Sequence, residues 1–294
     1  MAMARAPERR RKAALGLAAL VLAALGAFAR PASAQVLVQV VPNQLTLTAG
    51  PGERAERSVM VSNLGATAVA VRARLSDWTL GEEGDLGLAP LGSTPGTLLG
   101  AATLEPTELR LAPGASAAIR VRGDLGAGAR ATRWGMLLCE VRPLGRAAAG
   151  ASADTPVAGP AAELGATIFL TRLGPEAVHA EIVGLAVTPL GGDSVEVTAR
   201  VRNAGERQLN ASGDAAVRDT AGARLAGGAL ESGLVLPGMT RSFSWWGRVP
   251  HRSGPFVVSA TLDAGEPELI AGELRVPWPL ARPLARGAAA EAAR

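Results

Sequence analysis

The stretch "VPNQLTLTAGPGERAERSVMVSNLGATAVAVRARLSDW", residues 41–78, decides the fold. It contains no His, Cys or Lys, so a catalytic interpretation finds little to work with. Strand-like runs are broken by a Gly-Pro-Gly turn at 50–52 and by Asn63-Leu64-Gly65. Asn and Gly tolerate positive φ and therefore suit a tight turn between strands. A regular strand-and-turn pattern without reactive side chains indicates a β framework.

The same pattern continues along the chain, and helical periodicity is nearly absent after the first 34 residues. Val195, Val197, Ala199 and Val201 alternate with polar residues, which is typical of a sheet with one buried and one solvated face. Short strands at this spacing predict β-sandwiches. The expected strands are 36–40, 44–49, 57–62, 68–78, 108–111, 117–122, 133–142, 164–172, 180–187, 194–202, 215–219, 240–249, 256–262 and 268–276.

The chain also repeats itself. "VMVSNLG" at 59–65 resembles "ARVRNAG" at 199–205, and "LAPG" at 111–114 resembles "VLPG" at 235–238. The two pairs occur in the same order and at similar offsets, and each Pro-Gly suits a turn that enters a strand. This repetition predicts two homologous sandwiches in tandem.

The ends of the chain are expected to lie outside the sandwiches. A basic run at 9–12, an apolar run at 13–28 and a small-x-small site at Ala32-Ser33-Ala34 indicate a cleaved secretory signal peptide. The apolar run is short for a membrane span. We expect a signal peptide over 1–34, a first sandwich over 35–174 with a mobile loop at 144–162, a second sandwich over 175–278 and a disordered tail over 279–294.

Charge and cysteine content narrow the class of protein. The leader holds six of the 30 basic and one of the 26 acidic residues, which leaves 24 and 25 in the mature chain. A nearly neutral mature chain gives no support to nucleic-acid binding. Cys139 is the only cysteine, so no intramolecular disulfide can form, and its apolar neighbours predict a buried, inert thiol.

Reactive or metal-binding constellations are missing from the sequence. His179 and His251 lack ligand spacing, and the cluster at 82–85 lacks the spaced loop of a calcium hand, so a solvated hairpin turn is favoured there. No Gly-x-Ser-x-Gly elbow and no phosphate-binding glycine loop occur, and a mature chain without Lys excludes Ser-x-x-Lys. The sequence therefore predicts a protein that is not an enzyme and needs no metal or cofactor.

Two further features leave alternatives open. Trp245 and Trp246 are adjacent in an expected strand and point to opposite faces, so one can be core while the other faces solvent, the neighbouring sandwich or a ligand such as a carbohydrate. Arginines alternate on strands of the first sandwich, which fits either a solvated sheet face or an Arg-lined cleft for a carboxylate. These arginines are Arg72, Arg74, Arg120 and Arg122.

The order of these signals resembles the PapD-like superfamily of periplasmic pilus chaperones. The resemblance covers most of residues 36–173 and is carried, in sequence, by "VVPNQLTL", "SVMVSN", "SDW", "LAPGASAAIRVR", "RWGMLLCEVRP" and "ELGATIFLTRL". It implies an export signal, two immunoglobulin-like sandwiches and binding of subunits of pili or related fibres.

The resemblance also implies where a client would bind. Pilus chaperones hold the client's C-terminal carboxylate with an Arg on the first strand and a Lys on the last. Those positions fall near Asn43 and Phe169 here, and Arg172 is the nearest cation to the second. These chaperones lend an apolar last strand to the client, whereas residues 157–164 contain Pro160 and mostly small side chains, which fits that role poorly.

We therefore expect a non-enzymatic periplasmic protein of two immunoglobulin-like β-sandwiches that binds an exported polypeptide, such as a pilus, fibre or envelope subunit. An extended client segment would pair with an exposed edge strand, either 164–172 or 36–40. The alternative is a structural or adhesive module of a surface assembly, in which the sandwiches are spacers. Neither hypothesis involves nucleic acid or stable membrane insertion after signal cleavage. The expected client-binding residues are Leu164, Ile168, Leu170, Arg172 and Asn43.

Overall fold

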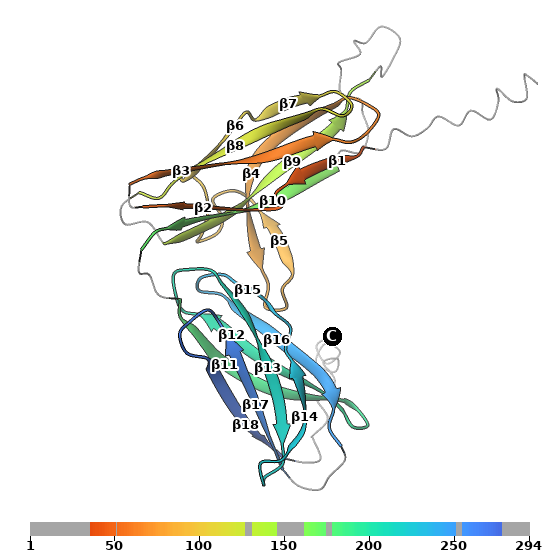
Figure 1. The fold of residues 1–294 in the computed structure, drawn as a ribbon, viewed down its shortest axis with the longest axis vertical. Coiled ribbons are helices and arrows are strands. Elements are labelled where there is room, and N and C mark those ends of the chain that lie inside the picture. The colour runs from red at the N-terminus through yellow and green to blue at the C-terminus, as the bar shows by residue number, and fades with distance from the viewer. Residues whose placement is uncertain are drawn as a thin grey trace, which may run out of the picture.

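The computed structural model describes residues 36–50, 52–126, 131–145, 162–174, 178–250 and 255–277. The expected signal peptide, most of the expected loop and the expected tail lie outside these residues. Every regular element in the described part of the chain is a strand, and the strands form four sheets (Figure 1). The prediction of an all-β fold with two immunoglobulin-like sandwiches is confirmed. Within the described residues there is no helix long and apolar enough to span a membrane.

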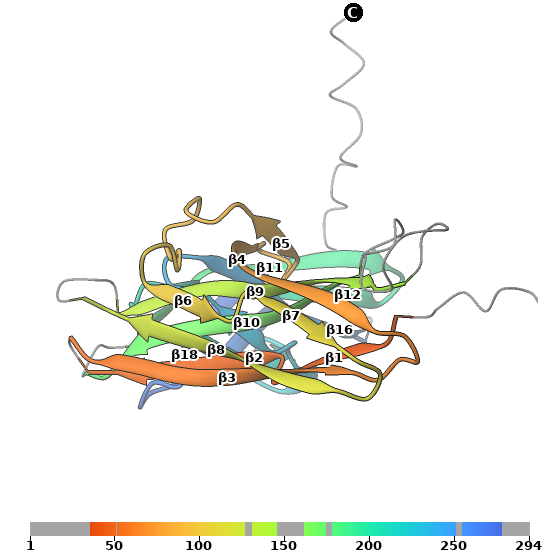
Figure 2. The same ribbon diagram turned by 90° about the horizontal axis from the view of Figure 1, so that it is seen from above.

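The first sandwich pairs one sheet in the order β1-β3-β8-β6 with another in the order β2-β10-β9-β4-β5, and β7 pairs with β4. In Figure 2 the layer with β3 and β8 lies on one side and the layer with β9 and β4 on the other. The strands are β1 Val38–Val41, β2 Gln44–Ala49, β3 Arg54–Asn63, β4 Val69–Leu80, β5 Leu86–Ala89, β6 Ala102–Glu105, β7 Glu108–Leu111, β8 Ser116–Asp124, β9 Thr132–Pro143 and β10 Ala162–Arg172.

The second sandwich pairs the sheet β11-β12-β16 with the sheet β14-β13-β17-β18, and β15 pairs with β13. Among the described residues, no strand ladder joins β1–β10 to β11–β18. The domain boundary at 174/175 itself stays a prediction. The strands are β11 Ala180–Gly191, β12 Ser194–Asn203, β13 Leu209–Arg218, β14 Arg224–Ala229, β15 Gly233–Val235, β16 Thr240–Arg248, β17 Phe256–Asp263 and β18 Ile270–Val276.

Alternation of side chains builds both cores. In β2 exposed and buried residues alternate strictly, so Leu45 and Leu47 point into the first sandwich. The inward residues of β9 include Cys139, which is fully buried, and this burial raises the pKa of its thiol to about 11. The expectation of a buried thiol is confirmed.

A buried asparagine explains the first copy of the repeat. The side-chain nitrogen of Asn63 donates to the backbone oxygens of Thr67 at 2.8 Å and of Leu111 and Ala112 at 3.1 Å. Its Oδ1 accepts from the backbone N–H of Gly65 at 3.0 Å. One side chain therefore ties the "SNLG" turn to the "LAPG" turn, which lies far away in the sequence.

Asn203 does the same in the second sandwich. Its side-chain nitrogen donates to the backbone oxygens of Arg207 at 2.7 Å and Val235 at 3.0 Å, and its Oδ1 accepts from Gly205 N–H at 3.0 Å. Asn63 and Asn203 are both fully buried, and each carbonyl accepts from the glycine of its own Pro-Gly turn at 2.8 Å. The sequence repeat is therefore a repeated hydrogen-bond network.

The two sandwiches meet through an aromatic cluster on the outer face of β4, β9 and β10. Trp78, Trp134 and Phe169 are buried there, and Leu236 of the second sandwich packs among them with its side chain fully buried. The rings of Trp78 and Phe169 are edge to face, with centroids 6.0 Å apart. This contact fixes one end of the β10 outer face against the second sandwich.

A hairpin makes a second joint between the sandwiches. The turn after β4 reaches the second sandwich (Figure 1), where the carboxylate of Glu82 accepts from Arg200 Nη2 at 2.8 Å and Nε at 3.1 Å. The backbone oxygen of Glu82 also accepts from Ser242 N–H at 2.7 Å. The expectation of a solvated hairpin turn at 82–85 is confirmed, since Glu82, Glu83 and Asp85 are exposed, but Glu82 also contacts the neighbouring sheet with both its backbone and its side chain.

Candidate functional site

Strand β10 is paired differently along its length. It pairs with β9 in antiparallel fashion from Ala162 to Thr171, but with β2 in parallel fashion only from Thr167 to Arg172. Among the described strands, β9 is therefore the only partner of residues 162–166. We call these five residues the open edge.

The direction of the hydrogen bonds identifies the backbone groups that the open edge presents. The N–H groups of Thr167 and Leu173 donate toward β2, to Asn43 at 2.9 Å and to Ala49 at 2.7 Å. Arg172 N–H donates instead to Ala131, beside β9, at 2.8 Å. Because successive residues of a strand point their polar groups to opposite sides, the N–H and C=O of residues 163 and 165 point away from β9, into the open side.

A second edge lies nearby. Strand β1 pairs only with β3 among the described strands and also lies against β10 (Figure 1). Leu64 N–H donates to the carbonyl of Leu37 at 2.8 Å, so by the same alternation Val38 and Val40 point their backbone groups away from β3. Two strand edges from the two sheets of one sandwich are therefore close together.

The outer face of the open edge has little side-chain bulk of its own. Gly165 carries no side chain, and Met136 and Leu138 of β9 lie over it. Glu163 is paired with Arg74 of β4, with Nη2 and Oε1 2.6 Å apart. An added strand would therefore meet a glycine, a thioether and a carboxylate.

Two of the expected client-binding residues, Ile168 and Leu170, do not lie at the surface. Ile168 and Leu170 are fully buried in the core of the first sandwich, and their stretch of β10 is paired on both sides by β9 and β2. The expected edge strand over 164–172 is therefore open only at its beginning. Leu164 lies within the open edge and is half-buried against the core.

Asn43 and Arg172 are not brought together. The parallel register places Gln44 beside Thr167 and Ala49 beside Arg172, so Asn43 and Arg172 lie at opposite ends of the ladder, about 20 Å apart. Asn43 is exposed. Its carbonyl accepts the first hydrogen bond between β10 and β2, from Thr167 N–H, and this bond marks the end of the open edge. Arg172 is half-buried, and its carbonyl accepts from Arg207 Nη2 at 3.0 Å. A carboxylate site shared by Asn43 and Arg172 is excluded by this register.

The four alternating arginines do not line one cleft. Arg72 and Arg74 lie on the outer face of the β4 sheet, whereas Arg120 and Arg122 lie on the outer face of the opposite sheet. Arg122 bonds Glu56 at 2.6 Å and lowers the pKa of that carboxyl. The interpretation as a single Arg-lined cleft is therefore wrong.

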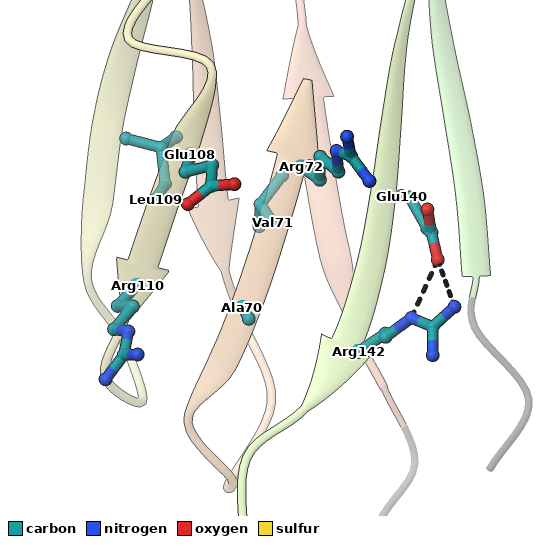
Figure 3. A pocket seen from close by; sticks show the side chains of 8 residues that line it. All are labelled: Ala70, Val71, Arg72, Glu108, Leu109, Arg110, Glu140 and Arg142. Carbon is teal, nitrogen blue, oxygen red and sulfur yellow. Dashed lines mark hydrogen bonds and ion pairs between the residues drawn. The ribbon is translucent and has the colours of Figure 1, made fainter. Parts of the chain in front are cut away.

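A shallow groove of about 550 Å³ crosses β7, β4 and β9 beside Arg72 (Figure 3). Ala70 is its floor between Arg110 and Arg142, and Arg72 lies between the carboxylates Glu108 and Glu140. Arg142 Nε donates to Glu140 Oε1 at 2.7 Å. Because cations and carboxylates alternate across the groove, it selects no single charge.

The paired tryptophans and the two histidines were the other candidate binding residues. Trp245 packs against the second core, Trp246 is 52% exposed, and neither belongs to the aromatic cluster between the sandwiches. The described residues contain no group of His, Cys, Asp and Glu that could hold a metal ion. His179 pairs with Glu181 at 3.3 Å, and His251 lies outside the described residues.

Asp77 is a buried residue of the first sandwich whose role sequence reasoning missed. It is fully buried and accepts from the backbone N–H groups of Gly92, Ser93 and Thr94 at 2.9–3.0 Å and from two threonine hydroxyls. The loop held by Asp77 also contacts Trp134, whose backbone N–H donates to the carbonyl of Gly96 at 2.7 Å. The "SDW" quoted for the family resemblance contained the signal, because an Asp beside a buried Trp needs hydrogen-bond partners.

No protein-family model and no curated protein matches this chain. Among solved structures, the class 5 fimbriae chaperone CfaA is 11% identical, with a TM-score of 0.45 over 81% of this chain and 98% of that chain. The CsuC–CsuE chaperone–tip subunit complex of Acinetobacter baumannii matches with 14% identity and a TM-score of 0.43, over 80% and 97% of the two chains. The complex of SafA pilin with the SafB chaperone from Salmonella enterica matches with 15% identity and a TM-score of 0.40, over 83% of this chain and 99% of that chain.

Proposed function

We propose that this protein is a non-catalytic periplasmic binding protein that pairs an extended segment of an exported polypeptide with the open edge. The observation that carries the proposal is that β2 covers only residues 167–172 of β10. The backbone N–H and C=O groups of residues 163 and 165 supply the hydrogen bonds of an added strand. Backbone groups at an uncovered strand edge bond to water, so pairing would exchange bonds to solvent for bonds to a client.

The neighbouring edge of β1 supports the same mode of binding. A client that contributes two extended segments can pair one with β10 and one with β1, because each of these strands has a stretch of edge that no other described strand covers. Leu164 would contact an inward side chain of the client, and Asn43 would mark the end of the paired segment. The class of client, a pilus or envelope subunit, and the periplasmic location follow from the sequence resemblance and the expected signal peptide.

Site-specific photo-cross-linking in the native envelope tests the proposal. A benzophenone amino acid at Glu163 should capture an exported protein, whereas the same group at Ser58, exposed on the opposite sheet, should not. Gly165→Pro removes the N–H that points into the open side and should abolish capture. Gly165→Ala is the matched control, because it adds a Cβ at the same place and keeps the N–H.

Two outcomes decide against strand addition. One is capture of the same proteins from positions 163 and 58, and the other is undiminished capture by a folded Gly165→Pro protein. If neither position captures an exported protein, the alternative of a structural or adhesive module takes its place.

A further inference from the structure

We infer that the open edge selects a client strand with a large apolar residue, best an aromatic one, beside Gly165 and a basic residue beside Glu163. This inference rests on the proposed strand addition and names the class of segment that is bound. The bulky side chain would come from the client, since β10 offers none on this face.

Gly165 is the first observation. A Cβ at this position would lie 2.7 Å from Met136 Sδ and 3.4 Å from Leu138 Cδ2. The position therefore tolerates no side chain of its own unless Met136 shifts. A cross-strand neighbour can instead lean over the glycine, as aromatic residues do beside glycines at sheet edges.

Met136 supplies the surface that such a residue would meet. It is 7% exposed and belongs to the aromatic and aliphatic cluster on the outer face of β9 and β10. A thioether is polarizable and makes favourable contacts with aromatic rings. A ring placed over Gly165 would cover the thioether and extend this cluster by one residue.

Glu163 sets the preferred charge. It lies two residues before Gly165 on the same face of the edge strand, and Arg74 engages its Oε1 from the side of β9. Glu140, its neighbour on β9, is bonded by Arg142. The charge nearest to an added strand is therefore the Glu163 carboxylate, and a directly opposed acidic residue would be repelled.

The spacing gives a pattern. Residues 163 and 165 face outward and Leu164 faces the core, so the client residue between the two outward contacts points inward toward Leu164. The preferred segment is basic, aliphatic, aromatic, in the order that the strand direction requires. The open edge spans five residues, about 17 Å, so only a short stretch of the client is read.

Cyclic β-hairpin peptides, which are preorganised strands, test the inference. Their outer strand carries Lys-Val-Trp, Lys-Val-Ala or Glu-Val-Trp at the central positions for parallel pairing with β10. A second set carries Trp-Val-Lys, Ala-Val-Lys or Trp-Val-Glu for antiparallel pairing. Calorimetry gives the affinity, and hydrogen exchange measures protection of the amides of residues 163 and 165. Replacing Trp by Ala should weaken binding about five- to tenfold, and replacing Lys by Glu about two- to fivefold.

Protein variants assign the preferences to residues. Gly165→Ala should reduce the Trp-to-Ala preference to less than about twofold, and Glu163→Lys should reverse the preference between Lys and Glu. Gly87→Ala, in the short strand β5, is the matched glycine control and should change neither. The peptide series on the unaltered protein stands by itself if a variant fails to fold.

The results separate the two proposals. If no hairpin protects the amides of residues 163 and 165, strand addition at this edge is wrong, and the selectivity falls with it. If all hairpins protect those amides with affinities within twofold of one another, strand addition stands and the selectivity is overturned.

Discussion

The two sandwiches share a buried asparagine network and differ in their last strands. In both, the asparagine ties an Asn-x-Gly turn to a Pro-Gly turn. In the first, β2 covers the outer side of β10 over residues 167–172, whereas β18 of the second pairs with β17 alone and no described strand covers its outer side. The repeated residues therefore build the framework, while the coverage of the last strand differs between the two sandwiches.

The buried carboxylate of Asp77 belongs to the first sandwich only, and its removal should have the largest effect. Asp77→Ala leaves three backbone N–H groups without their acceptor, so we expect a loss of about 3–4 kcal/mol in the free energy of unfolding. Urea unfolding measures it. Asp219→Ala is the control, because Asp219 is only half-buried and accepts from the backbone N–H groups of Ala221 and Ala223 in the second sandwich, so its removal should cost less than about 1 kcal/mol. Equal losses would contradict the importance of burial.

The asparagine pair should give the next largest effect. Asn63→Ala and Asn203→Ala each remove a fully buried side chain that bonds several backbone groups, so each should cost roughly 2–3 kcal/mol. Each side-chain amide has two hydrogens, and Asn63 shares one of them between the carbonyls of Leu111 and Ala112, so the two losses should be of similar size.

Hydrogen exchange should locate each loss in the sandwich of the mutated residue. Asn63→Ala should accelerate exchange in β3 and β8, and Asn203→Ala in β12 and β16. Faster exchange confined to the opposite sandwich, or a negligible effect of both substitutions, would show that the repeated turns are not the supports described here.

Much of the framework of the two sandwiches could be predicted from the sequence. The turn signals at Asn63 and Asn203 act locally, and side-chain alternation predicts the ends of most strands to within a few residues of those in the structure. Strands β5, β6, β14 and β15 were missed, because they have three to six residues and little alternation, as in "LGLA" and "RLAGGA". Such strands form because a longer neighbour pairs with them.

The candidate site was predicted only in part, for a physical reason. The last strand of the first sandwich was correctly expected to have an edge, but Ile168 and Leu170 are covered because β2 pairs with the second half of β10. Where one strand stops covering another is decided by register between segments more than 100 residues apart. The same register separates Asn43 from Arg172, and no local pattern reports it.

A pH dependence should distinguish the sandwiches next, because Cys139 lies in the first. Burial raises the pKa of its thiol from 9.0 to about 11. The folded state therefore holds the proton where the unfolded state has lost it. The stabilising contribution is full below pH 9 and is lost as the pH rises from 9 to 11, by on the order of 1–3 kcal/mol.

The amino-acid composition leaves few other groups that titrate between pH 9 and 11. The chain has no Tyr, and its one Lys, Lys12, lies in the expected signal peptide, so few other groups titrate in that window. Urea unfolding between pH 8 and 10.5 measures the decline, and Cys139→Ala should flatten it. A decline of equal size in the Cys139→Ala protein would assign it to another group.

The smallest effect on stability is expected at the joint between the sandwiches. Glu82→Ala removes the contact of the carboxylate with Arg200 but keeps the backbone bond to Ser242 and the packing of Leu236. The ion pair is exposed, and such pairs contribute little to unfolding free energy. Its role is then orientation, because the pair holds the hairpin turn to one place on β12.

Distances between spin labels on the two sandwiches, measured by pulsed electron resonance, test this role. Glu82→Ala should broaden the distribution, and high salt should broaden that of the unaltered protein in the same way, since salt screens exposed charges. Glu83→Ala, one residue along the same turn, is the control. An unchanged distribution in the Glu82→Ala protein would mean that the aromatic cluster and the backbone bond alone set the angle. The second sandwich would then be held by packing, and the charged turn would add no constraint.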